Sequence, residues 1–105
     1  MKSVVVMSSL PDIVFFWADE AFTEHLNKIS LEAGFISEDY NEATVDINAA
    51  LQFFSPLVAS QRYMNEVNNP YYSITCGNGM TIVIDQVQCM IIGFECFDYW
   101  ICCNY

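Results

Sequence analysis

The residues best suited to chemistry in this chain are carboxylates, which gather in two stretches of the first half. These are Asp19, Glu20 and Glu24, followed by Glu38, Asp39, Glu42 and Asp46. Acidic residues in a first helical turn stabilise the helix through its dipole, and a run of charge usually marks a solvated face. That accounts for Glu38 and Asp39, but not for Asp46 or for the near absence of lysine that would pair with these groups. The pattern therefore predicts an acidic surface that binds a cationic partner.

The overall charge supports the same expectation. Thirteen Asp and Glu stand against three Lys and Arg, a formal net charge of -10, while 54% of the residues are hydrophobic. A chain this apolar buries enough surface to fold, so the charge is carried on a compact body. Such a surface attracts a basic protein and is repelled by anionic lipid. With so few cations and no glycine-rich phosphate loop, we expect neither direct nucleic-acid binding nor membrane binding.

Aromatic residues close to carboxylates form a second candidate contact surface. Phe16 and Phe53 lie near acidic stretches, and Trp100 lies close to Asp98. Aromatic side chains with a rim of carboxylates are typical anchors for a partner rich in Arg or Lys. The competing interpretation is core packing, which is the ordinary role of such residues. Phe53, Asp98 and Trp100 are therefore predicted, with the seven carboxylates, to bind the partner.

The sequence predicts no catalytic residue, no metal site and no cofactor. A single histidine, His25, lies beside Glu24, and a lone histidine at the edge of a helical stripe is usually structural. The five cysteines all fall in the last third, and they are Cys76, Cys89, Cys96, Cys102 and Cys103. Their odd number and spacing do not resemble a disulfide framework or a thiolate zinc site. We expect small apolar side chains in a sheet, and a reducing, cytoplasmic setting.

The elements that must position these residues predict one α+β domain over residues 1–105. Val4–Met7 is β-branched and predicts a short strand or a frayed end. A first helix is expected from an N-cap at Ser9 to Gly34, with Phe16 projecting into its acidic side. A second is expected from Ser37 to Phe54, and a third, restarted by Pro56, runs to Val67. Asn68, Asn69 and Pro70 end the helical part.

After Pro70 the apolar period changes from near 3.6 residues to near 2, which indicates strands. Gly77-Asn78-Gly79 separates two alternating segments and predicts a hairpin. Further strands are expected over 89–97, with a bulge at Gly93, and over 99–103, although a helix over 86–97 fits the same apolar run. The predicted fold has N-terminal helices packed on a C-terminal antiparallel sheet of three to four strands.

The function that this sequence favours is inhibition of a cationic protein without catalysis. In charge character the chain is similar to small acidic immunity and nuclease-inhibitor proteins, which predicts an immunity protein against a nuclease toxin of the contact-dependent or bacteriocin type. Two alternatives remain open. One is a phage-type DNA mimic of the anti-restriction or anti-CRISPR kind, and the other is a small subunit of an obligate oligomer. The sequence leaves the oligomeric state undecided.

Overall fold

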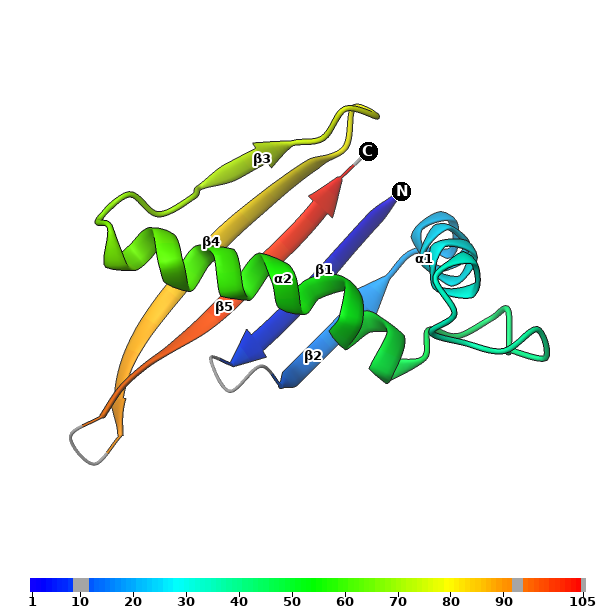
Figure 1. The fold of residues 1–105 in the computed structure, drawn as a ribbon, viewed down its shortest axis with the longest axis horizontal. Coiled ribbons are helices and arrows are strands. Elements are labelled where there is room, and N and C mark those ends of the chain that lie inside the picture. Colours follow the sequence, from blue (N-terminus) through cyan, green and yellow to red (C-terminus); the bar gives the residue numbers. More distant parts are fainter. Residues whose placement is uncertain (9–11, 92–93, 105) are drawn as a thin grey trace.

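Over the residues that the structure describes, the protein is built on a five-stranded antiparallel sheet with two helices (Figure 1). The computed structural model describes residues 1–8, 12–91 and 94–104. The strands are β1 (Lys2–Ser8), β2 (Ile13–Ala18), β3 (Ser73–Thr75), β4 (Thr81–Ile91) and β5 (Phe94–Asn104). They lie in the order β2-β1-β5-β4-β3, so the last strand of the chain pairs with the first.

The α+β class holds, but the predicted arrangement of helices and sheet is wrong. The N-terminal segment is part of the sheet, because β1 pairs with β2 on one side and with β5 on the other. The sheet therefore has five strands rather than three or four, and it is not confined to the C-terminal part. The predicted strand at Val4–Met7 is confirmed as the middle of β1.

The helix expected from Ser9 to Gly34 is wrong in its first half. Ser9 lies outside the described residues, and Ile13–Ala18 forms strand β2. This run is rich in β-branched and aromatic residues and is apolar at every position, so it has no one-sided helical stripe. Such a run suits a pleated surface better than a helix. Helix α1 (Glu20–Glu32) begins after Asp19, whose carboxylate accepts a hydrogen bond from the Phe22 amide. The predicted end is confirmed, since Gly34 follows the helix with φ of 80°.

The two helices expected over 37–54 and 55–67 are wrong, because the structure has one helix, α2 (Ile47–Glu66). Residues 37–46 form turns, in which the Asn41 side chain accepts a hydrogen bond from the Ala43 amide. Pro56 lies inside α2 on its exposed side, where water can solvate the carbonyl left without a donor. The buried residues Phe54 and Val58 flank the proline and hold the two halves on one core.

The hairpin around Gly77-Asn78-Gly79 is confirmed by the pairing of β3 with β4, and Gly79 takes a φ of 88°. The boundaries expected for the later strands, and the alternative helix over 86–97, are wrong. Strands β4 and β5 each span 11 residues and pair from Thr81–Asn104 to Ile91–Phe94. The bulge expected at Gly93 lies outside the described residues.

The core lies between one face of the sheet and both helices. Helix α2 crosses the strands on this face (Figure 1). The sheet contributes buried residues from three central strands, which are Val5, Met7, Ile82, Ile84, Tyr99, Ile101 and Cys103. Phe22 and Leu26 of α1 and Phe54 and Val58 of α2 pack against them. Neither described helix is long and apolar enough to span a membrane.

Candidate functional site

The face of the sheet opposite the helices carries exposed aromatic and aliphatic side chains. In an antiparallel sheet, residues directly opposite one another point to the same face, and that face alternates along each strand. Since Val5 and Ile101 point to the core, their neighbours in β1 and β5 point to the other side. We define the apolar band of this open face as Val4, Val6, Phe15, Trp17, Val83 and Trp100.

The pairing register of the sheet places residues from four strands side by side in the apolar band. Val4 is opposite Trp17 of β2 and Cys102 of β5, and Cys102 is opposite Val83 of β4. In the next row, Val6 is opposite Phe15 and Trp100, and Trp100 is opposite Asp85. The two rows are adjacent on one face, so their side chains form one continuous surface.

The band remains accessible although it is rich in apolar surface. Phe15 is 52% exposed, Trp17 48%, Trp100 49% and Val83 47%. Val6 is only 7% exposed, because it lies between two aromatic neighbours. Contiguous apolar surface of this kind on a folded domain usually marks an interaction site. The band is therefore the first candidate binding surface.

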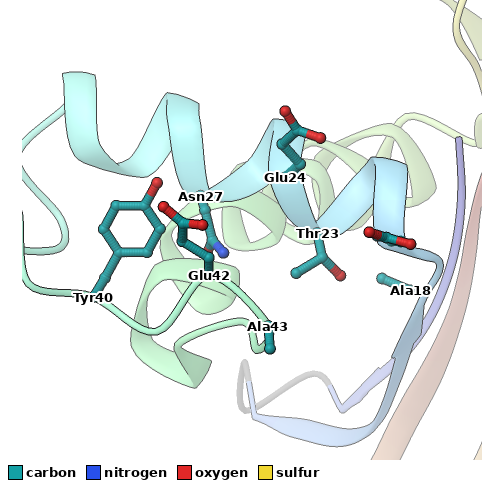
Figure 2. Close-up of a pocket in the computed structure, with 8 residues that line it drawn as sticks. Ala18, Thr23, Glu24, Asn27, Tyr40, Glu42 and Ala43 are labelled. Atoms are coloured by element: carbon teal, nitrogen blue, oxygen red, sulfur yellow. The ribbon is translucent and has the colours of Figure 1, made fainter.

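A second candidate is a hollow of about 640 Å³ between α1 and the loop that follows it. We call it the acidic groove, and its polar lining is Glu20, Thr23, Glu24, Asn27, Tyr40 and Glu42. Figure 2 shows Tyr40 and Glu42 on the loop side and Thr23 and Glu24 on α1. The Glu24 carboxylate points away from Glu42, so these groups do not converge on one point. The groove can attract positive charge without forming a chelating site.

The predicted acidic residues are thus only partly brought together. Glu20, Glu24 and Glu42 line the acidic groove, while Asp39 and Asp46 line a second, smaller hollow beside Asn27. Glu38 is exposed in the loop and lines neither. The seven carboxylates therefore do not form one ridge along a helix.

Two of these carboxylates cap helices. Asp46 is the N-cap of α2, and its side chain accepts hydrogen bonds from the amides of Asn48 and Ala49 at 2.9 and 3.1 Å. Asp19 is the N-cap of α1 and also accepts a hydrogen bond from the Lys2 amide at 2.9 Å. The N-terminal ammonium lies 3.5 Å from Asp19. The hydrogen bonds of Asp46 explain its position without a binding partner. The contacts of Asp19 join the start of β1 to the start of α1.

The predicted aromatic anchors separate into core and surface. Phe53 is partly buried, and its ring packs edge-on against Phe22 and Phe54, with ring centroids 6.3 and 4.9 Å apart. Phe16, expected on an acidic helical side, instead points to the core and lies edge-on to Phe54. Trp100 is exposed in the apolar band. Asp98 pairs with Ser8 in β1, and its side chain lies outside the described part.

Phe15, Trp17 and Val83 were missed as candidate binding residues. Their signal was present, because β-branched and aromatic residues dominate residues 13–18. Assigning this run to a helix hid the two-residue alternation that places Phe15 and Trp17 on one face. Val83 belongs to a correctly predicted strand, but the sequence does not say which face of that strand is covered.

The described side chains include no group of three or more His, Cys, Asp and Glu that could hold a metal ion. His25 packs beside the Phe22 ring, with ring centroids 6.4 Å apart. Cys76, Cys102 and Cys103 are free thiols. Burial raises the pKa of Cys103, which keeps this thiol protonated and weakly nucleophilic.

The contacts of Asp19 predict a stability that depends on pH. Hydrogen bonds from the Phe22 and Lys2 amides lower the pKa of this carboxyl below its usual value of 3.8. A carboxyl whose pKa is lower in the folded state stabilises the fold above its unfolded pKa, and this contribution is lost as pH falls through the folded pKa. The free energy of unfolding, measured in urea, is expected to fall more for wild type than for Asp19→Asn when the pH is lowered from 5 to below about 3.8.

Asparagine also caps helices, so the Asp19→Asn variant keeps the cap while removing the charge. Parallel loss of stability in the two proteins over this pH range would contradict the role assigned to the ionised carboxylate.

The chain matches one protein-family model, described as the first longin domain of FUZ, MON1 and HPS1, over residues 2–93. No curated protein and no solved structure matches it. The family match covers β1 to β4 with both helices, and so includes the N-terminal strands of the sheet. The chain belongs to the family of first longin domains of FUZ, MON1 and HPS1.

Proposed function

We propose that the chain is a non-enzymatic protein-binding domain of membrane-trafficking machinery, which binds its partner through the apolar band. The longin family to which it belongs is related to trafficking. The observation that carries the proposal is the exposure of Trp17, Trp100 and Phe15 on one face of the sheet. Aromatic residues of this kind supply most of the binding energy at protein interfaces.

The expectation of an immunity protein that neutralises a nuclease toxin is wrong. It depended on charge character alone, whereas the family match over residues 2–93 points to trafficking. The same match gives no support to DNA mimicry or to a subunit of an obligate oligomer. Acidic charge is shared by many unrelated functions, so it does not identify one.

A cationic protein remains the proposed partner. The net charge of -10 favours such a partner through its association rate, and the acidic groove adds local attraction. The same charge disfavours direct contact with anionic lipid, so recruitment to a membrane would depend on a protein. The free thiols of Cys76, Cys102 and Cys103 fit the reducing cytoplasm.

Co-sedimentation with isolated intracellular membranes tests the proposal. The purified chain is expected to bind untreated membranes and to lose binding when the membranes are first treated with protease. The double variant Trp17→Ser/Trp100→Ser is expected to lose binding as well, and vesicles of pure anionic lipid are expected to bind neither protein. Tyr63→Ser is the matched control, because Tyr63 is a 63% exposed aromatic residue on α2.

Two results would overturn the proposal. One is equal membrane binding by wild type and the double variant, which would remove the apolar band from the interaction. The other is equal binding to untreated and protease-treated membranes, which would show that no protein partner is needed.

A further inference from the structure

We infer that the acidic groove binds an arginine side chain of the partner protein, whose guanidinium lies over Thr23 and Asn27. This inference rests on the proposed function for the nature of the partner, and it names the residue type that this partner presents to the groove. Three features of the groove support it: carboxylates without counter-charges on both sides, buried oxygens without partners between them, and an aromatic ring at one end.

The carboxylates of the groove are not neutralised within the chain. Glu20 and Glu24 lie one turn apart on α1, and Glu42 lies on the loop opposite (Figure 2). In the part of the chain that the structure describes, none of the three forms an ion pair. No Lys, Arg or His is among the lining residues, and Lys28 of α1 is exposed outside the groove. The groove therefore attracts a positive charge that the chain does not supply.

Two buried polar side chains lie between these carboxylates, and we call them the floor of the groove. Thr23 is 8% exposed and Asn27 is 3% exposed. The Asn27 amide nitrogen donates to the Thr44 carbonyl at 3.0 Å. The side-chain oxygens of Thr23 and Asn27 have no hydrogen-bond partner among the described residues, and both remain open to the hollow. Figure 2 shows Thr23 projecting from α1 toward the space above Ala43.

The floor makes the groove more than a charged surface. Exposed carboxylates alone hold a cation weakly, because water and salt screen the pair. Buried polar side chains are nearly always hydrogen-bonded, so two of them with free oxygens in a hollow mark the place of a donor. A hydrogen bond from a charged donor to such a desolvated oxygen is stronger than a bond between neutral groups. A ligand with both positive charge and several donors gains from the walls and the floor together.

Arginine matches this set of groups better than a metal ion or lysine does. Carboxylates and the Asn27 oxygen only accept hydrogen bonds, and a guanidinium has five donors and no acceptor. A metal ion needs ligands that converge, but the Glu24 carboxylate points away from Glu42 (Figure 2). The ring of Tyr40 lines the same hollow, and a planar guanidinium stacks on an aromatic ring, whereas a lysine ammonium is a compact, strongly hydrated charge.

The groove is continuous with the surface proposed for partner binding. Ala18 lines the groove, and Trp17, the residue before it in β2, belongs to the apolar band. Strand β2 is the outermost strand on this side of the sheet. A partner bound to the band therefore reaches the groove around the edge of β2.

Titration of the intact, ¹⁵N-labelled chain with a capped peptide Gly-Ser-Arg-Ser-Gly, followed by NMR, tests the inference. The peptide is expected to bind with a Kd of about 1 mM, with the largest shifts at the amides of Thr23, Asn27 and Glu42. The same peptide with citrulline in place of arginine keeps the shape but is neutral, and it is expected to bind at least about tenfold more weakly. A lysine peptide is expected to bind about threefold more weakly.

Three variants assign the binding to the groove. Glu24→Gln/Glu42→Gln is expected to weaken binding of the arginine peptide at least about tenfold. The matched control, Glu32→Gln/Glu66→Gln, removes the same net charge at exposed positions outside the groove and is expected to change the affinity less than about twofold. Thr23→Val keeps the shape of the side chain and is expected to weaken binding about fivefold without lowering the stability to urea, because the hydroxyl bonds to no described residue.

The inference is overturned if the arginine and citrulline peptides bind equally well, or if the two glutamine pairs weaken binding to the same extent, since net charge alone would then explain it. Equal binding of the lysine peptide would overturn the assignment to arginine. If the arginine peptide does not bind while membrane binding still depends on the apolar band, the groove inference fails and the proposed function stands. Binding in the groove together with membrane binding that ignores the apolar band would keep the arginine site and remove the proposed function.

Discussion

Replacing Phe54 with alanine is expected to lower the free energy of unfolding by about 3–5 kcal/mol, a large part of the 5–15 kcal/mol typical of a domain. Phe54 is fully buried, and its ring centroid lies 6.2 Å from that of Phe16, 6.4 Å from that of Phe22 and 4.9 Å from that of Phe53. These rings join α2 to β2 and α1. Truncation removes the contacts and leaves a cavity that these elements cannot easily fill.

Urea unfolding followed by circular dichroism measures this loss, with Phe15→Ala as the matched control. Phe15 is 52% exposed in the apolar band, so the same truncation there is expected to cost less than about 1 kcal/mol. Phe54→Leu, which keeps most of the volume, provides a milder variant if Phe54→Ala does not fold. Equal losses at Phe54 and Phe15 would contradict the placement of the core on the helical face.

Replacing Gln61 with leucine is expected to cost about 2–3 kcal/mol, because it leaves buried polar groups without partners. Gln61 is 1% exposed on α2. Its amide nitrogen donates to the Tyr71 carbonyl at 2.9 Å and to the Gln86 side chain at 3.1 Å, and its oxygen accepts from the Tyr71 amide at 2.8 Å. One side chain therefore joins the helix to the segment before β3 and to β4.

The control is Gln52→Leu, the same substitution at an exposed position of α2, where the expected change is within about 0.5 kcal/mol. Urea unfolding of wild type and the two variants gives the change in the free energy of unfolding that each substitution causes. A Gln61→Leu protein as stable as wild type would show that water or another group satisfies the Tyr71 backbone, and that the Gln61 side chain is not needed to join α2 to this segment.

Local patterns predicted some of this fold well. The hairpin of β3 and β4 followed from glycine and asparagine between two alternating segments, and Gly34 ended α1 as expected. Other elements were misassigned where two local patterns competed. Acidic residues near the start of a helix are ambiguous, because Asp46 could belong to a charged helical side or act as an N-cap. The structure shows the N-cap, and residues 37–46, which were expected to begin a helix, form turns.

The open face could not be predicted because it depends on pairing between distant segments. β5 is inserted between β1 and β4, and this long-range register decides which side of Trp100 is covered. Periodicity shows that a strand has two faces, but not which face the helices cover. The sequence predicts Trp100 as a binding residue from the acidic residues near it along the chain. In the structure Trp100 lies on the open face, opposite Val6 of β1 and Asp85 of β4.

The accessibility of Trp17 and Trp100 to a small quencher shows whether the apolar band is an open surface of the free chain. Acrylamide quenching is measured on the free chain over a range of protein concentrations. The free chain is expected to be quenched readily at every concentration, since both indoles are about half exposed. Poor quenching of the monomeric free chain would show that this face of the sheet is covered, and would contradict its assignment as the binding surface.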